Sequence, residues 1–482
     1  MALATKVLSS TIWASVDRFG TISLQFFVNL ILARLLTPAD YGCIGMLSIF
    51  IVVSQVLIDG GFGSALIQKK QPTQVDYSTI FFWNLLFSGF LYVVLSFSAP
   101  WIAMFFRMPL LKDVLRVWGL VLIINSFGII QNNRLRKLLD FKKISLVNIL
   151  SLSSAFLAGV FLAYRGWGVW SLVAMYLINA VLNAGTLWLV ARWYPSRTFS
   201  FAALKELFGF GGFLLASNVL QEICKNLQGL IIGRKFSSTE MGLYSQAKKL
   251  DDVACLTLPN VIMKVLFPVY AQFQNDLKQL RKKLDMSVQV ISFVTFPLVA
   301  ILILVAHPLI GFLYGDKWEG AIPYFQILCV GGLFACLQNV NYFAVAALGK
   351  SKSLFRWSFY KWGMLFVFLL SGMHWGIHGI LWGMVLSSLN IYLVNALLVS
   401  KYCHYPLMKQ LKKILLVFLL SLLVAVLVWL FDQWLPIPFG MTIVLYVIVY
   451  MVMAWLMRME AWKNCISIVV LFAKRKNDNN KE

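Results

Sequence analysis

Residues 214–234 read LLASNVLQEICKNLQGLIIGR, a stretch long enough to cross a membrane as a helix yet marked by polar side chains throughout. A spanning helix needs ~20 predominantly apolar residues. The polar residues are related by steps of three or four, so on a helix they share one face. They are Asn218, Gln221, Glu222, Lys225 and Gln228. An ionised group at the bilayer centre costs about 2.5–3.5 kcal/mol on insertion scales, so this face is expected to meet protein or water and not lipid.

Two interpretations of this polar face stay open. In the first, the face lines a hydrated path through the membrane. In the second, Glu222 and Lys225 form an ion pair that locks two helices together. Ionisable groups inside membrane segments are functional by default, which favours the hydrated path.

The chain as a whole is far more apolar than a soluble protein. Of its 482 residues, 60% are hydrophobic and 13% are charged, whereas ~25% are charged in a typical soluble protein. About fourteen apolar windows have nearly the spanning length. They cover residues 12–36, 41–66, 78–100, 114–132, 144–164, 168–191, 208–233, 241–270, 287–306, 322–348, 357–373, 376–399, 412–431 and 439–457. We therefore predict an all-α polytopic membrane protein with about 14 transmembrane helices.

The formal net charge of +23 would suit a nucleic-acid-binding protein, but the basic residues gather in short connections between apolar windows. Cytoplasmic loops of membrane proteins have this pattern. The basic connections are every second one, and the tail KRKNDNNKE (474–482) is basic too. We therefore expect no nucleic-acid partner and cytoplasmic N- and C-termini. Because no cleavable signal pattern begins the chain, the first span should remain as an anchor.

Two segments match at an offset of 200 residues. Residues 34–42 read RLLTPADYG and residues 234–242 read RKFSSTEMG, so Arg, Ser or Thr, an acid and Gly recur in register. Ser or Thr followed three residues later by an acid is typical of a capping box at a helix start. Upstream, Arg18, Gln25 and Asn29 share one helical face, and the positions 200 residues later are Asn218, Lys225 and Gly229. We interpret the chain as two duplicated halves.

The duplication predicts two six-helix lobes, residues 1–200 and 201–400, followed by two additional transmembrane helices and a basic tail in residues 401–482. Because each lobe has an even number of spans, the repeats should run parallel, related by an axis along the membrane normal. The linker between the lobes is expected at residues 192–205, which read RWYPSRTFSFAALK.

Five cations fall at membrane depth and are candidates for a substrate-binding site: Arg18, Lys225, Lys248, Lys249 and Lys264. Excess positive charge attracts an anion, and phosphate suits both the bidentate fork of Arg and the point charge of Lys, so a phosphate-bearing lipid head group is expected. Lys248 also has the i, i+4 spacing for an ion pair with Asp252. Alternatively, Lys248 and Lys249 snorkel to the membrane interface.

Three acids are candidates for carrying a coupling proton or sodium ion, as intramembrane carboxylates often do. They are Asp17, Asp59 and Glu222. Asp59 begins the run DGGFGSA (59–65), whose glycines permit unusual backbone angles, so a helix end is an equally good interpretation there. No other cofactor is expected.

Several other kinds of site are disfavoured by the sequence. The seven cysteines are scattered and form no C-x-x-C pair, which is not typical of a disulfide framework or a metal site. His374 and His378 have the spacing of two zinc ligands but no carboxylate or cysteine nearby in the sequence. No Walker A, G-x-S-x-G or H-E-x-x-H motif occurs in a plausible context. We therefore expect neither a metal site nor an enzyme.

Further short motifs are spread over the first twelve windows. They are LLTPADYG (35–42), GFGSALIQ (61–68), GLYSQA (242–247), LYGDKW (313–318) and LGK (348–350). With these motifs the chain resembles a bacterial polysaccharide transporter, a Wzx-type oligosaccharide-lipid flippase of the multidrug/oligosaccharidyl-lipid/polysaccharide exporter superfamily. Within that family it is most similar to the colanic-acid and teichuronic-acid exporter branch. The motifs mark the family and not the glycan.

The resemblance implies two lobes around a cationic cavity, and alternating access that moves an undecaprenyl-diphosphate-linked oligosaccharide from the inner to the outer leaflet of the bacterial cytoplasmic membrane. The cargo would serve surface polysaccharides such as O-antigen, capsule or exopolysaccharide, with other polysaccharide assembly proteins as candidate partners. The five cations would pair with the diphosphate while the lipid tail stays in the bilayer. The sugar would be held by the polar residues Gln25, Asn29, Asn218, Gln221 and Gln228.

Three other functions compete with this one. A cation-coupled drug antiporter of the same superfamily would prefer an acidic cavity, which the excess of basic residues disfavours. A lipid II-type flippase would share the cationic cavity. A membrane glycan polymerase, which is an enzyme, would need a sizeable catalytic loop, and no connection between the windows is long enough.

Overall fold

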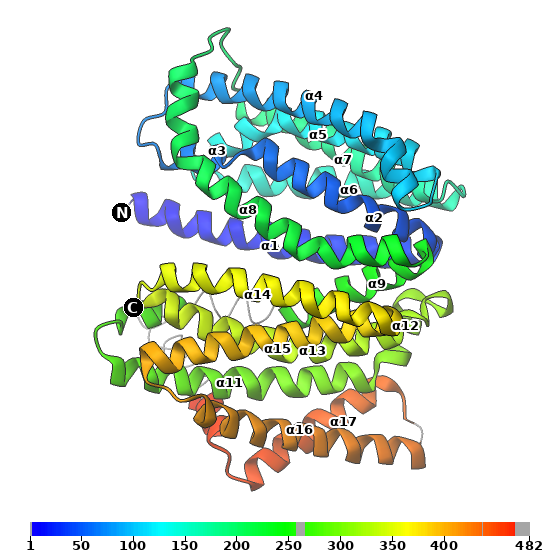
Figure 1. Cartoon of the computed structure of the whole chain (residues 1–482), viewed down its shortest axis with the longest axis vertical. Coiled ribbons are helices and arrows are strands. Elements are labelled where there is room, and N and C mark those ends of the chain that lie inside the picture. The colour runs from blue at the N-terminus through cyan, green and yellow to red at the C-terminus, as the bar shows by residue number, and fades with distance from the viewer. Residues whose placement is uncertain (1, 257–265, 436, 468–482) are drawn as a thin grey trace. The chain divides into compact units, whose positions relative to one another are not determined.

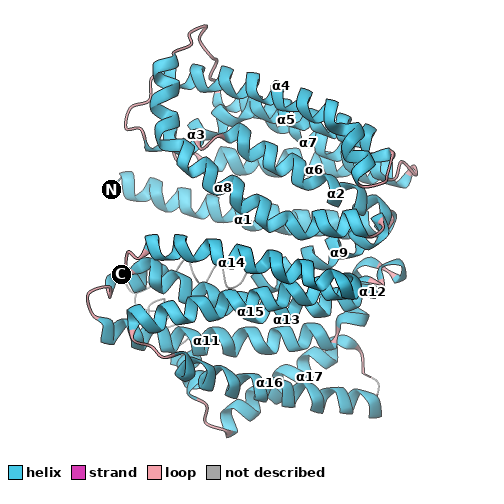
Figure 2. Ribbon diagram, viewed as in Figure 1, coloured by secondary structure: helices cyan, strands magenta, loops and turns pink. Residues whose placement is uncertain are grey.

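The computed structural model describes residues 2–256, 266–435 and 437–467, and these residues form helices and no β-strand (Figure 1). Mostly short loops connect the helices (Figure 2). The elements of the first half are α1 (Ala2–Leu35), α2 (Pro38–Asp59), α3 (Phe62–Gln68), α4 (Gln74–Phe105), α5 (Leu110–Lys137), α6 (Phe141–Tyr164), α7 (Val169–Ala191), α8 (Phe201–Lys235), α9 (Ser238–Asp251) and the π-helix η1 (Asp252–Leu256). Those of the second half are α11 (Leu277–Leu304), α12 (Ala306–Tyr314), η2 (Asp316–Trp318), α13 (Ala321–Ala347), α14 (Ser351–Gly372), η3 (Met373–Trp375), α15 (Gly376–Cys403), α16 (Leu407–Trp434) and α17 (Phe439–Leu456).

Eleven stretches of the described helices are long and apolar enough to cross a membrane. One of them, Lys352–Cys403, contains most of α14 together with α15. The 35-residue helix α8 is not among them, in keeping with the polar face that its sequence predicts. The prediction of an all-α polytopic membrane protein is confirmed, whereas the count of 14 spans is not.

The chain divides into two compact units, Met1–Ser245 and Gln246–Glu482, called here the first and second unit. In the first unit α1 packs on α6, α5 lies between α4 and α7, and α8 packs on α2. In the second unit α13 packs on α11 and α15, and α16 joins α11 to α17. Within each unit most of the long helices run nearly parallel or antiparallel, whereas the first turns of α8 run across the other helices of the first unit (Figure 1). The predicted repeat boundaries at residues 200 and 400 stay predictions.

The two matching segments begin α2 and α9 with the same cap. The Thr37 hydroxyl accepts a hydrogen bond from the Asp40 amide, and the Asp40 carboxylate accepts one from the Thr37 amide at 2.9 Å. At α9 the Ser237 hydroxyl accepts a hydrogen bond from the Glu240 amide at 3.2 Å. The predicted helix starts are therefore confirmed, with a complete capping box at Thr37 and a cap hydrogen bond at Ser237.

The same two segments meet inside the first unit through their glycines. A Cβ placed on Gly42 would lie 1.8 Å from the carbonyl oxygen of Ser238, and one on Gly242 would lie 1.7 Å from that of Pro38. Each glycine therefore touches the backbone that precedes the other glycine. A Cβ on either residue would prevent this approach, which is why small residues mark such close helix contacts. We call this reciprocal contact the glycine crossing.

Candidate functional site

The polar face of α8 lies on the surface of the protein chain. The side chains of Gln221 and Lys225 are exposed, and those of Asn218, Glu222 and Gln228 are half-buried. All of them lie on one continuous helix, as the sequence predicts. The helix therefore presents a cation and several amides along one side.

Glu222 and Lys225 form an ion pair, with 3.0 Å between Oε1 and Nζ and with 25% and 50% of the two side chains exposed. The pair joins neighbouring turns of α8, so it does not by itself lock two helices together. The Lys225 carbonyl oxygen also accepts a hydrogen bond from the Gln228 side chain. An i, i+3 pair on a helix surface is worth about 0.2–0.5 kcal/mol, so stability alone gives little reason for it.

The corresponding face of α1 is also accessible. Arg18 and Gln25 are exposed, and Asn29 is half-buried. Both faces belong to the first unit, but their helices pack on different neighbours, α1 mainly on α6 and α8 mainly on α2. A common path for the two faces stays a prediction.

Asp17 is tied into the helix bundle and not into the α1 polar face. Its carboxylate accepts a hydrogen bond from the Asn148 side-chain amide at 3.0 Å, and the Asn148 oxygen accepts one from Asn183 at 3.0 Å. This chain of hydrogen bonds connects α1, α6 and α7. Asp17 therefore has a structural partner, and its coupling role stays a prediction.

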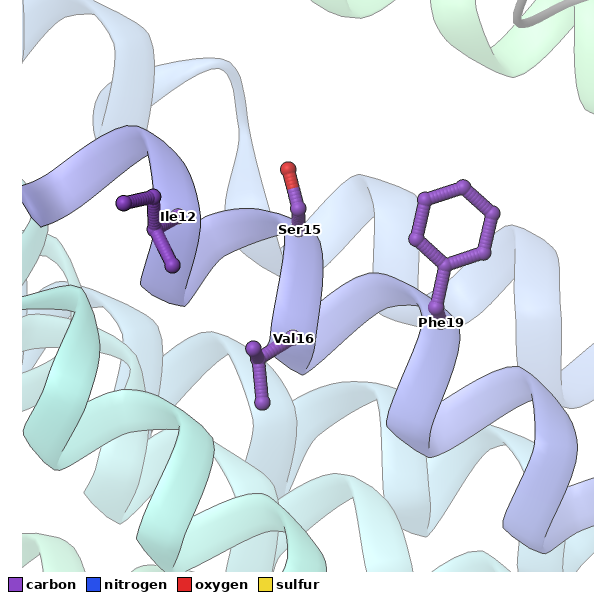
Figure 3. Close-up of a pocket in the computed structure, with 4 residues that line it drawn as sticks. All are labelled: Ile12, Ser15, Val16 and Phe19. Atoms are coloured by element: carbon purple, nitrogen blue, oxygen red, sulfur yellow. The ribbon is translucent and has the colours of Figure 1, made fainter. Parts of the chain in front are cut away.

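An apolar hollow lies on another face of α1. The residues that line it are Ile12, Ser15, Val16 and Phe19 (Figure 3). They follow the i, i+3, i+4, i+7 spacing of a single helix face. Because three of the four are apolar and none is charged, the hollow offers contacts for an apolar surface and not for a diphosphate.

Both ends of α8 contact other elements of the first unit. Near its start, Glu206 pairs with Lys69 at 3.0 Å, and Lys69 pairs with Asp76 of α4 at 3.1 Å. Desolvation lowers the pKa of Lys69, but its hydrogen bonds to Glu206 and Asp76 outweigh that effect, so the pKa lies above the ordinary 10.5. Near the end of α8, the Arg234 guanidinium lies 5.0 Å from the ring centre of Phe105. These contacts hold the polar face in a fixed place on the unit.

The candidate lysines of the second unit differ in their surroundings. Lys248 pairs with Asp251 at 2.8 Å and with Asp252 at 2.9 Å, so the predicted Lys248–Asp252 pair is confirmed. Asp251, which the sequence analysis did not single out, is only 3% exposed. The only feature of the sequence that could have predicted this ion pair is the i, i+3 spacing of Lys248 and Asp251. Lys249 is exposed, and Lys264 lies outside the described residues.

Asp59 is the last residue of α2, as the helix-end interpretation predicts. Gly60 and Gly61 follow it with φ angles of 59° and 71°, the left-handed region that glycine adopts without strain. A Cβ on Gly63 would lie 2.9 Å from Asn133 Nδ2 and 3.2 Å from Asp59 Oδ1. Asp59 therefore lies at a polar corner between α2, α3 and α5, and its coupling role stays a prediction.

Comparison with known proteins connects the chain to polysaccharide biosynthesis. It is 27% identical over 365 residues to the teichuronic acid biosynthesis protein TuaB of Bacillus subtilis, covering 74% of each chain. It is 24% identical over 406 residues to the lipopolysaccharide biosynthesis protein WzxC of Escherichia coli, covering 83% of this chain and 81% of the other. The succinoglycan biosynthesis transport protein ExoT of Rhizobium meliloti is 26% identical, with 72% and 70% covered.

Solved structures share the fold. The lipid II flippase MurJ in an inward closed conformation matches with a TM-score of 0.75 at 15% identity, covering 92% of this chain and 98% of that one. An inward-facing multidrug transporter of the MATE family matches with a TM-score of 0.63 at 14% identity, covering 82% and 98%. At these identities the likeness concerns the fold alone.

A family model described as polysaccharide biosynthesis protein matches residues 31–323, more than half of the chain. The resemblance found in the short motifs is thereby confirmed. The eleven long, apolar stretches of the described helices make this a multi-pass membrane protein. The chain belongs to the polysaccharide biosynthesis protein family.

Proposed function

We propose that this protein is a flippase that moves an undecaprenyl-diphosphate-linked oligosaccharide from the inner to the outer leaflet of the bacterial cytoplasmic membrane. The observation that carries the proposal is the exposed polar face on α8, which bears Lys225 in a chain with eleven stretches long and apolar enough to cross a membrane. Relatives named for teichuronic acid, lipopolysaccharide and succinoglycan biosynthesis support a glycan cargo. A flippase, not an enzyme, is what this set of features favours.

A diphosphate can displace the carboxylate that Lys225 now contacts. The Lys225–Glu222 pair is half-exposed and weak, so exchanging its partner costs little. A diphosphate carries more negative charge than one carboxylate, so it is the better partner for the ammonium group. Arg18 would add a bidentate contact. The side-chain amides of the two faces would then bind the sugar. Their hydrogen bonds would replace those that the sugar makes with water in solution.

The glycine crossing would close one end of this path. If the termini lie in the cytoplasm, as the basic connections predict, then the starts of α2 and α9 lie at the outer surface. When the two glycines are in contact, the crossing would keep the cargo from the outer leaflet. When the two segments separate, the cargo would be released there. A proton or sodium ion carried by Asp17, Asp59 or Glu222 would supply the coupling.

The test uses the full chain in proteoliposomes containing a fluorescent undecaprenyl-diphosphate-linked disaccharide and a quencher that cannot cross the membrane. Losing a charge-assisted contact costs about 1.5–3 kcal/mol, so Lys225→Gln and Arg18→Gln should each slow flipping roughly tenfold or more. Lys143→Gln is the matched control. Lys143 pairs with Asp140 at the same i, i+3 spacing, at 2.8 Å and with 50% of its side chain exposed, but at the start of α6. This variant should flip the lipid like the wild type.

Wild-type rates in both Lys225→Gln and Arg18→Gln would overturn the proposed binding face. Two further arms separate the competing functions. Faster flipping of lipid II than of the glycan carrier would assign the protein to peptidoglycan precursors, and export of a cationic dye would assign it to drug transport. Repeating the assay with imposed proton and sodium gradients identifies the coupling ion.

A further inference from the structure

Three buried residues of the second unit form a cluster that the proposed function does not use. Asp251 ends α9, Cys255 lies in η1, and Cys329 lies on α13. Each contributes a metal-ligating atom, and these atoms all lie within 4.8 Å of one another. Asp251 and Cys255 are four residues apart, whereas Cys329 comes from a distant part of the chain, so the sequence analysis, which expected no metal site, could not detect the cluster.

The Asp251 carboxylate is only half satisfied. Its Oδ2 accepts a hydrogen bond from Lys248 Nζ at 2.8 Å. Its Oδ1 is buried, and its neighbour is the Cys255 thiol, a weak donor that does not reach good hydrogen-bond geometry with it. A buried acceptor without a partner is costly, and a bound cation is one way to satisfy it.

A glycine leaves room beside the cluster. A Cβ on Gly332 of α13 would lie 3.0 Å from Cys255 Sγ and 3.5 Å from Asp251 Oδ1. One helical turn further, the Cys336 thiol donates a hydrogen bond to the Cys255 carbonyl oxygen at 3.1 Å. The thiol of Cys336 thus fixes η1 against α13, and Gly332 keeps the adjoining space free of side chain.

We propose that Asp251, Cys255 and Cys329 bind a thiophilic divalent cation of the zinc class. Two sulfur ligands favour such a metal over Na⁺ or Mg²⁺, which prefer oxygen, so this site is distinct from a coupling-ion site. Tetrahedral zinc with Zn–S bonds of about 2.3 Å places its sulfur ligands ~3.8 Å apart, a small adjustment from atoms that already lie within 4.8 Å.

The charges at the site balance. One divalent cation offsets the two thiolates, and the Lys248 ammonium offsets the buried Asp251 carboxylate, while its second partner, Asp252, is 48% exposed to solvent. Three protein ligands leave a fourth coordination position for water. Bound metal would tie the end of α9 and η1 to α13, which is an effect beyond cargo binding.

The test measures Cd²⁺ binding to the reduced full chain in detergent, by thiolate-to-metal charge-transfer absorption and by metal content after gel filtration. We expect one ion per chain. Cys255→Ser, Cys329→Ser and Asp251→Asn should each weaken binding by more than the roughly 10–100-fold that outer-shell changes cost. Gly332→Ala removes no ligand but crowds Cys255, so it should weaken binding by the roughly 10–100-fold of an outer-shell change. Cys403→Ser is the matched control, because Cys403 is a buried cysteine of the same unit, 0% exposed like Cys255 and Cys329, and it should bind as the wild type does.

Several outcomes would overturn the proposal. They are a wild-type chain that elutes as folded protein but holds no stoichiometric metal, a Cys403→Ser variant as weak as Cys255→Ser, and a Cys255–Cys329 disulfide found by mass spectrometry in protein purified without reductant. Flipping rates do not enter this test, so its failure leaves the proposed function standing.

Discussion

Residues 18–42 and 218–242 have similar local structures, each the end of a long helix followed by the start of a second one, but they carry different side chains. At the glycine crossing the copies agree, because Gly42 and Gly242 each touch the backbone ahead of the other. On the preceding helix they differ, since Gln25 corresponds to Lys225 and Asn29 to Gly229. Only glycine fits where two backbones approach this closely, so the two segments have the same residue at the crossing. The proposed cargo has a charged end and a sugar end, so it does not require the two polar faces to be alike.

The strongest test of the symmetry is to add a methyl group at either glycine. Gly42→Ala and Gly242→Ala would each place a Cβ less than 2 Å from a carbonyl oxygen, so we expect each to cost about 3 kcal/mol or more. Thermal unfolding of the purified chain measures this. Gly89→Ala in α4 is the control, since nothing lies within 4 Å of its Cβ. A tolerated change at one of the two glycines alone would show that the crossing is not symmetric.

The next test moves the cation from one copy to the other. Lys225→Gln should lower the flipping rate by about tenfold, as the lost charge-assisted contact requires. Adding Gln25→Lys to that variant should recover part of the rate, provided the two faces meet the same cargo. The readout is the proteoliposome assay. Gln25→Lys alone serves as the control, and no recovery in the double variant would mean that the faces serve different paths.

A smaller effect is expected at the two helix caps. Thr37→Ala and Ser237→Ala each remove a hydroxyl that accepts a backbone amide hydrogen bond. Each should lower the free energy of unfolding by roughly 0.5–2 kcal/mol. Thr239→Ala, at an exposed position beside the second cap, should change it little. A cost at Thr37 with none at Ser237 would show that only the first copy depends on its cap.

The smallest effect is expected at the contacts that attach α1 and α8 to the rest of the first unit. The Ser10 hydroxyl ties α1 to the Leu139 carbonyl oxygen at 2.7 Å, whereas α8 uses the Lys69–Glu206 ion pair. Because Glu206 is 63% exposed, Glu206→Gln should cost at most about 1 kcal/mol. The folded-state pKa of Lys69 is raised above 10.5, so its contribution is complete below that pH and is lost as the pH rises through the folded-state value. Wild type and Glu206→Gln should therefore converge in alkaline urea titrations, and a constant difference would contradict this origin.

Local patterns in the sequence predicted the parts of this structure that neighbouring residues determine. The cap at Thr37, the polar face of α8 and the Lys248–Asp252 pair all follow from spacings of three or four residues. The offset of 200 showed that Gly42 and Gly242 are equivalent, but not that they touch. The cluster of Asp251 and Cys329 joins helices far apart in the chain, and no local periodicity reports such a contact.

The glycine crossing also limits how the two matching segments can change in sequence. Elsewhere in a protein core, a larger residue on one side can be accommodated by a smaller one on the other. Neither Gly42 nor Gly242 has a side chain left to shorten, so an enlargement on one side has no compensating change on the other. If the two halves arose by duplication, as the sequence offset predicts, the two glycines should remain recognisable as equivalent positions after most of the surrounding sequence has changed.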